Sequence, residues 1–234
     1  MADRLAGLLI DAATGTPPPV DLQTVLLPRP PGPVSAVLGF TGHHVVAADV
    51  DRSWLDATRE VADFGSVMRA PFLAALGARV GASVGHLDVV LAAPRVDEVD
   101  PGAASPEVEL VEIDAASDAH GRVRRALAYR RDVRAHRTPD GSGLVMFGRG
   151  LTGRYEIAFE VEPHARGRGL GAALASAGPY LTPSGEPLFA QVSPGNVASL
   201  RVLLAAGYQP IGSEVLLLHP RDGASSRGRA PSTP

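Results

Sequence analysis

The chain contains no cysteine. This absence excludes disulfide bonds, thiolate nucleophiles and cysteine-ligated metals. The chain also lacks lysine, so all 22 basic residues are arginines. Because alanine, glycine, proline and valine are abundant as well, a GC-rich coding sequence explains the arginines, and their number alone predicts no function.

Long apolar runs and a net positive charge are missing too. No apolar stretch approaches the roughly 20 residues that a membrane-spanning helix needs, and the first eleven residues are too weakly basic and too briefly apolar for a secretory signal. The net charge of −3 argues against general binding of nucleic acid. We therefore expect a soluble, cytoplasmic protein that interacts with neither membranes nor nucleic acids.

Composition divides the 234 residues into four segments. Residues 1–33 form a proline-rich segment that we expect to be flexible, because the prolines between Thr16 and Pro33 prevent a regular helix there. Residues 34–100 form an α/β region of unassigned role, and residues 97–106 are the best linker candidate. A second unit covers residues 107–220, and residues 221–234 are expected to be a disordered tail.

Hydrophobic periodicity and turn residues predict the helices and strands. The first unit begins with a hairpin of residues 36–40 and 44–50, followed by a helix capped by Asp51 or Ser53, a helix that starts at Pro71, and a strand of residues 87–92. In the second unit the predicted strands are residues 107–113, 132–137, 143–147, 155–161, 188–192 and 211–218. The predicted helices there are residues 120–131, 169–177 and 196–206.

A glycine-rich turn follows the alternating strand of residues 155–161. Its glycines allow a ligand to approach the backbone, and the helix that opens there presents unpaired N–H groups and the positive end of its dipole. Arg166 and Arg168 add positive charge. The turn therefore predicts a phosphate site, although purely structural glycines remain an alternative. The P-loop ending Gly-Lys-Ser/Thr and the Rossmann order of elements are both absent.

The pattern Arg-x-x-Gly-x-Gly after an alternating strand resembles the pyrophosphate-binding segment of the GNAT acyltransferases. A second segment, residues 193–208, resembles the family's other cofactor segment, in which an asparagine opens a helix that closes with Gly-Tyr. The resemblance covers about residues 107–218. It implies an α/β fold with a mixed, mostly antiparallel sheet flanked by helices and splayed before the turn. Residues 1–100 are then an N-terminal α/β extension or a degenerate second copy of the fold.

This resemblance implies an N-acetyltransferase that uses acetyl-CoA and no metal. The acceptor would be a small-molecule or peptide amine, and the absence of cysteine favours direct transfer. The residues that the resemblance assigns to the cofactor are Val161, Glu162, Arg166, Gly167, Arg168, Gly169, Leu170, Gly171, Ala172, Asn196 and Ser199. Asn196 and Gly207 are also good helix caps, which gives both a structural interpretation without a ligand.

Side-chain alternation places Glu156, Ala158, Glu160 and Glu162 on one face of their strand. This acidic stripe is either a solvated strand face or the lining of a cleft that attracts a cationic amine. The resemblance implies that Glu156 is the general base, because a partly buried glutamate with a raised pKa could accept the amine's proton at neutral pH. Glu160 and Glu162 are weaker candidates.

One position departs from the family pattern. Leu203 stands where many members have a tyrosine that protonates the thiolate, so we assign no general acid. This departure leaves a non-catalytic acyl-CoA-binding or sensing module, or a dimerisation or partner-binding domain, as alternatives, and a homodimer stays open. We expect His43 and His44 to be solvated or capping residues in a turn. The arginines of residues 122–137 predict a solvated face in preference to a site for the cofactor's 3′-phosphate or an acidic partner.

Overall fold

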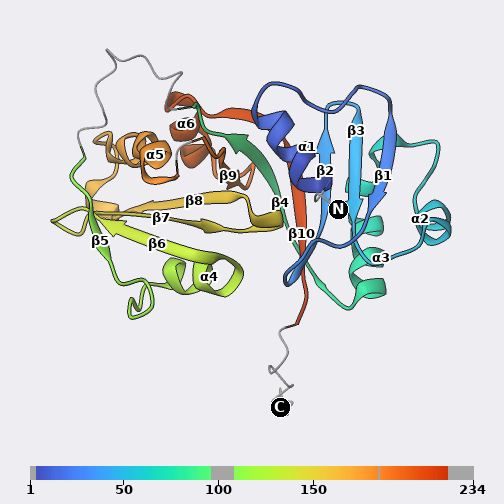
Figure 1. Cartoon of the computed structure of the whole chain (residues 1–234), viewed down its shortest axis with the longest axis horizontal. Coiled ribbons are helices and arrows are strands. Elements are labelled where there is room, and N and C mark those ends of the chain that lie inside the picture. The colour runs from blue at the N-terminus through green and yellow to red at the C-terminus, as the bar shows by residue number, and fades with distance from the viewer. Residues whose placement is uncertain (1–3, 96–107, 184, 221–234) are drawn as a thin grey trace, which may run out of the picture.

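The computed structural model describes residues 4–95, 108–183 and 185–220. The predicted linker of residues 97–106 and the predicted tail of residues 221–234 lie outside the described residues. A single ten-stranded sheet runs through the described chain, in the order β1-β3-β2-β10-β4-β9-β8-β7-β6-β5 (Figure 1). The strands are β1 (Gln23–Leu27), β2 (Val34–Phe40), β3 (His43–Ala47), β4 (Ser83–Ala92), β5 (Val111–Ile113), β6 (Arg131–Arg137), β7 (Gly143–Arg149), β8 (Tyr155–Val161), β9 (Leu188–Val192) and β10 (Gln209–Leu218).

Neighbouring strands run antiparallel, except that β1 with β3 and β8 with β9 are parallel. The predicted α/β fold with a mixed, mostly antiparallel sheet is therefore confirmed. The helices are α1 (Arg4–Ala13), α2 (Arg52–Thr58), α3 (Ala70–Val80), α4 (Gly121–Tyr129), α5 (Leu170–Leu181) and α6 (Val197–Ala205). Short 3₁₀ turns lie at Phe64–Met68, Leu151–Gly153 and Pro163–Ala165. Within the described residues, none of the helices has the length and apolar character needed to cross a membrane.

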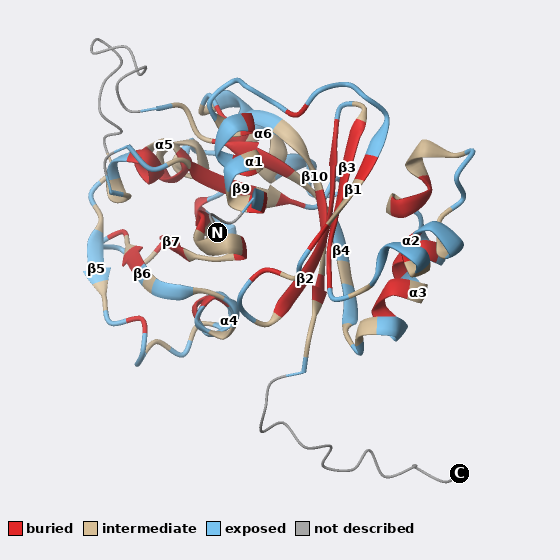
Figure 2. Cartoon of the chain, turned by 45° about the vertical axis from the view of Figure 1, so that its right-hand side comes forward, coloured by how far each residue is buried: buried red, intermediate tan, exposed pale blue. Residues whose placement is uncertain are grey.

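Helices cover both faces of the sheet. Because side chains alternate along each strand, neighbouring strand residues pack against helices on opposite faces. On one face, Leu5 and Leu9 of α1 pack on Leu38, while Val123 and Ala126 of α4 pack farther along the sheet. On the other face, α2 and α3 cover the N-terminal strands, and α5 and α6 cover β7, β8 and β9. Figure 2 shows β2 and β3 buried between these layers.

Local signals fix several element ends as predicted. Asp51 caps α2 by accepting a hydrogen bond from the Trp54 backbone N–H at 2.8 Å, and Pro71 lies in the first turn of α3. Gly81 ends α3 with a φ of 66°, a left-handed conformation that glycine adopts without steric cost. Capping and turn preferences depend only on residues that are close in the chain, so these helix ends can be predicted from the sequence.

The two halves of the chain exchange strands at the centre of the sheet. β4, from the first half, lies between β9 and β10 of the second half, and β10 lies between β4 and β2 of the first half (Figure 1). The boundary between two sequence segments near residues 100–107 stays a prediction. Strands from both segments belong to one continuous sheet.

The expectation of a flexible segment over residues 1–33 is wrong for much of that segment. Residues 4–13 form α1, whose Leu5, Leu9 and Ala12 are buried. Residues 23–27 form β1, which pairs in parallel with β3 and buries Thr24 and Leu27. The prolines flank this strand and leave its interior free, so they set its limits without preventing it.

Candidate active site

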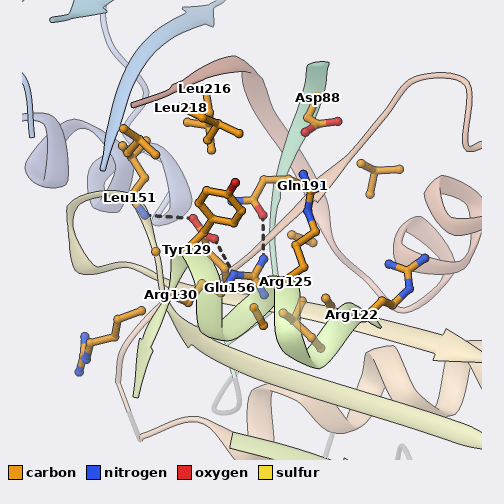
Figure 3. A pocket seen from close by; sticks show the side chains of 18 of the residues that line it. Asp88, Arg122, Arg125, Tyr129, Arg130, Leu151, Glu156, Gln191, Leu216 and Leu218 are labelled. Atoms are coloured by element: carbon orange, nitrogen blue, oxygen red, sulfur yellow. Dashed lines mark hydrogen bonds and ion pairs between the residues drawn. The ribbon is translucent and has the colours of Figure 1, made fainter. Parts of the chain in front are cut away.

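β8 and β9 diverge in the middle of the sheet. They pair only at Tyr155–Ile157 with Leu188–Ala190, although β8 continues to Val161 and β9 to Val192. A cavity of about 450 Å³ opens beside this divergence. It is lined by residues 156–159 of β8 and the end of β9, by α4 and the start of α6, and by Asp88 of β4 and Leu216 and Leu218 of β10 (Figure 3).

The predicted phosphate turn lies where β8 ends. Gly167 and Gly169 have φ angles of 75° and 86°, and open space surrounds the position where each would carry a Cβ. α5 begins directly afterwards at Leu170, so its first N–H groups lack partners within the helix. Arg166 and Arg168 are exposed beside the turn. The geometry suits an anion approaching the backbone from solvent.

The two segments that resemble cofactor segments meet in the fold. A Cβ on Gly171 of α5 would lie 3.6 Å from the Val202 side chain of α6, an ordinary packing distance. Asn196 caps α6 by accepting a hydrogen bond from the Ser199 N–H at 3.2 Å, and both residues line the cavity. The structural interpretation of Asn196 as an N-cap is confirmed. A cofactor role for either residue stays a prediction.

The backbone assigned to the pantetheine arm is already hydrogen-bonded in part. The Glu162 N–H donates to the Ser142 carbonyl at 2.9 Å, and the Val161 carbonyl accepts from Nε of Arg166 at 3.0 Å. A ligand that pairs with Val161 would therefore displace the exposed Arg166 side chain, which would then be free to contact a phosphate.

Glu156 lies on β8 with its carboxylate buried among donors, its side chain only 6% exposed. Its oxygens accept from Nε of Arg130 at 2.9 Å and from the Leu151 N–H at 3.2 Å (Figure 3). They also accept from Nε of Arg154 at 2.9 Å. Gly150 makes room for this arrangement, because a Cβ at that position would overlap the carboxylate. Glu156 thus anchors two arginines and the turn before β8.

The raised pKa expected for Glu156 is wrong. Burial by itself would raise the pKa, but the guanidinium groups of Arg154 and Arg130 outweigh that effect and lower the pKa below its usual value. Arg130 is 26 positions away and reaches Glu156 only in the folded chain. Arg154 is two positions away and points to the same side of the extended chain, so it was a local signal that the expectation left out. The general-base role stays a prediction, although an ionised carboxylate with three donors is a weak proton acceptor.

Arg154 extends the charge cluster to a residue that the sequence did not indicate. Its Nη2 donates to Oε1 of Glu214 on β10 at 2.6 Å, and both side chains are buried. Burial raises the pKa of Glu214, and Arg154 offsets this only partly. A charged residue inside an otherwise apolar strand was the available signal for Glu214, and equally for Asp88 of β4.

Arginines pair with Glu156 and Glu160 of the acidic stripe and also interact with other carboxylates. Glu160 interacts with Arg122 of α4, while Arg134 and Arg137 interact with Glu112 and Asp118. Five of the seven arginines in residues 122–137 are exposed, as expected for a solvated face. Four of the seven are also engaged in ion pairs: Arg122, Arg130, Arg134 and Arg137. α4 lies over the acidic face of β8, which is why its arginines find partners there.

Two further expectations, for the histidines and for the turn between β2 and β3, differ from the structure. His43 and His44 are buried in β3 and are not solvated turn residues: His43 contacts Asp21 at 2.9 Å, and His44 stacks on Phe64. The turn is one residue shorter than expected and centres on Gly42. Leu203 is buried, and Tyr208 packs at the helix end, where its hydroxyl donates to the Ala175 carbonyl.

A parallel pair of strands that diverges beside a glycine turn and a helix, within a mixed, mostly antiparallel sheet, is the arrangement that the sequence resemblance implied. The fold of this chain is GNAT-like. No protein-family model matches the chain, and no curated protein sequence matches it either.

Solved structures with this fold align with the chain at low identity. A GCN5-related N-acetyltransferase from Kribbella flavida is 18% identical, with 96% of this chain and 97% of that one covered and a TM-score of 0.41. A tandem GNAT protein from the clavulanic acid biosynthesis pathway is 18% identical, with coverage of 66% and 61% and a TM-score of 0.38. A Drosophila protein is 17% identical, with coverage of 74% and 60% and a TM-score of 0.39. The chain thus spans about three-fifths of the last two proteins. The fold assignment rests on the mixed, mostly antiparallel sheet and on the divergence of β8 and β9.

Proposed function

We propose that this GNAT-like chain is an acyltransferase that moves an acetyl group from acetyl-CoA directly to an amine. The observation that carries the proposal is the divergence of β8 and β9, with a cavity on one side and the glycine turn at the end of β8. An elongated thioester fits such a gap, with its pyrophosphate at the turn and its acyl group at the cavity.

The chemistry needs an unprotonated amine held beside a thioester carbonyl. The backbone of β8 beyond Ile157 has no partner in β9, so its N–H groups are candidates to polarise that carbonyl. Direct transfer agrees with a chain that has no cysteine to carry an acyl intermediate. The thiolate leaves without a tyrosine at position 203, which its modest basicity permits.

Calorimetric titration with acetyl-CoA, with free CoA and ATP as comparisons, tests the cofactor part of this proposal. We expect binding of both CoA species and none of ATP, followed by release of free thiol when an amine is added. A well-folded sample that binds neither CoA species would refute the proposal.

A second candidate is a non-catalytic acyl-CoA-binding module. It is favoured by Leu203, which is buried and offers no acid near the thiolate, and by the lowered pKa of Glu156, where Arg154 and Arg130 overcome the effect of burial. Acetyl-CoA binding without thiol release, over a broad panel of amines, would support this candidate over the enzyme.

A further inference from the structure

We propose that the acceptor is a free amino acid, whose amine is deprotonated by Asp88 and whose carboxylate is bound by Arg125. This proposal rests on the acyltransferase function proposed above and names its acceptor class. Both residues line the cavity, Asp88 from β4 and Arg125 from α4. Figure 3 shows the Arg125 side chain extending from α4 toward Asp88.

Asp88 differs from Glu156 in having no partner. Within the described residues its carboxylate makes no hydrogen bond and no ion pair. Burial raises the pKa of Asp88, and His86 and Arg125 offset this only partly. The neighbouring strands present Glu214, directly opposite on β10, and Gln191 on β9, opposite Val90. Of the two carboxylates in the cavity lining, Asp88 is the one able to take a proton.

Arg125 is likewise free to bind an anion. Of the four other arginines of the lining, three are engaged: Arg130 pairs with Glu156, Arg122 with Glu160, and Arg149 with Glu186. The fourth, Arg131, lies on β6 and is exposed. Arg125 makes no ion pair in the described part of the chain, and its guanidinium lies 5.9 Å from the centroid of the Tyr129 ring. A free cation and a free carboxylate that share one cavity complement a ligand with both charges.

Gln191 adds a third polar side chain to the cavity lining. Its Oε1 accepts from Arg130 at 3.4 Å, and a hydrogen bond from the same side chain helps to lower the pKa of Glu156. The buried Nε2 makes no hydrogen bond of good geometry among the described residues. The carboxylate of an amino acid can therefore compete with Glu156 for this donor.

The transfer step balances with these groups. Asp88 takes one proton from the ammonium, and the nitrogen lone pair then forms the C–N bond to the acetyl carbon. The electrons of the C–S bond go to sulfur, and the proton lost by nitrogen on forming the amide passes to the thiolate. Asp88 finally releases its proton to water, so the products are an N-acetyl amino acid, free CoA and one proton.

The test compares each common L-amino acid with its α-carboxamide as acceptor, using release of thiol from acetyl-CoA as the readout. We expect kcat/KM to be about 10- to 100-fold higher for the preferred acid than for its amide. Arg125→Gln should lower the value for the acid to that for the amide. Arg124→Gln, on the same helix but outside the cavity lining, should keep the preference.

Asp88→Asn should lower kcat by 100-fold or more and leave the KM for acetyl-CoA close to its original value, with the acidic limb of the pH profile lost. Equal use of acids and amides, a preference that survives Arg125→Gln, or full activity of a folded Asp88→Asn variant would each overturn the proposal. Titration of the same samples with acetyl-CoA separates the two proposals. Binding without a carboxylate preference refutes the acceptor class alone, whereas a folded sample that binds no acetyl-CoA refutes both.

Discussion

Glu156 is buried between two arginines, and this position determines what the side chain can do. Its two ion pairs are formed by Arg154, which is itself buried, and by Arg130. Removing one partner from such a buried cluster leaves charge without compensation, whereas an exposed ion pair contributes little. At the scale of single residues, the Glu156 carboxylate is therefore expected to contribute mainly to the stability of the fold.

Glu156→Gln is expected to destabilise the fold by about 3 kcal/mol or more, because Arg154 and Arg130 lose their counter-charge in a buried site. For a chain of this length the melting temperature should fall by roughly 10 °C, as measured by calorimetry or circular dichroism. Glu186→Gln, in the exposed pair with Arg149, is the matched control and should cost less than about 1 kcal/mol. Equal shifts in the two variants would contradict the structural role.

At the scale of elements, two turns beside β8 position the residues of the candidate site. The turn between β6 and β7 is held by Asp140, which accepts hydrogen bonds from the Thr138 and Ser142 hydroxyls and from the Ser142 N–H. The turn after β8 is held by glycines with positive φ. Each turn gives a prediction that can be measured without knowledge of the acceptor.

Hydrogen bonds to Asp140, first of all from Thr138, lower its pKa to about 2. A lowered carboxyl pKa contributes stability that is complete above the ordinary value near 3.8 and is lost as the pH falls toward 2. Asp140→Asn should therefore lower the melting temperature at neutral pH, and the difference from the original chain should vanish toward pH 2. The exposed Asp11→Asn in α1 is the control. A difference that does not change with pH would refute the assignment.

Gly169→Ala is expected to cost about 1–2 kcal/mol, because φ at this position is 86°. It should also weaken acetyl-CoA binding about 10-fold or more, since the turn is proposed to receive the pyrophosphate. Gly15→Ala carries the same backbone strain at a φ of 87° and lies outside the site, so it controls for stability. Titration calorimetry on both variants measures the effect, and equal affinities would contradict the phosphate assignment.

At the scale of the whole molecule, the exchange of β4 and β10 joins the two halves of the chain into one sheet. Neither half can complete its sheet without a strand of the other, and Asp88 on β4 brings the first half into the cavity of the second. We therefore propose that residues 1–100, expected from the sequence to be an extension or a second copy, help to build the wall of the substrate cavity. Cooperativity between the halves should follow from the same topology.

Unfolding in urea is expected to be a single transition. The chain has one tryptophan, Trp54 in α2, whose ring lies 6.0 Å from that of Phe72, so its fluorescence reports on the first half. Far-UV circular dichroism reports on both halves, and the two transitions should coincide because the strands are interleaved. A fluorescence transition at clearly lower urea would show that the first half unfolds independently.

Sequence reasoning located the elements of the second unit and the glycine turn, because periodicity, caps and positive-φ glycines depend on residues close together in the chain. It misjudged residues 4–27, where α1 and β1 are stabilised by distant strands. It also proposed Glu156 from its place on β8 but assigned the wrong direction to its pKa.

The sequence by itself therefore determined the order and type of most elements and the shape of the turn after β8. Only the tertiary structure decided which charges meet and which strands are neighbours. Arg154 and Glu214 are 60 positions apart, and β4 reaches its place between β9 and β10 across the whole second unit. The physical reason is that ion pairing and strand pairing depend on distance in space, which no local pattern encodes. For the same reason, only the structure shows that Glu156 is paired with arginines while Asp88 has no ion pair among the described residues.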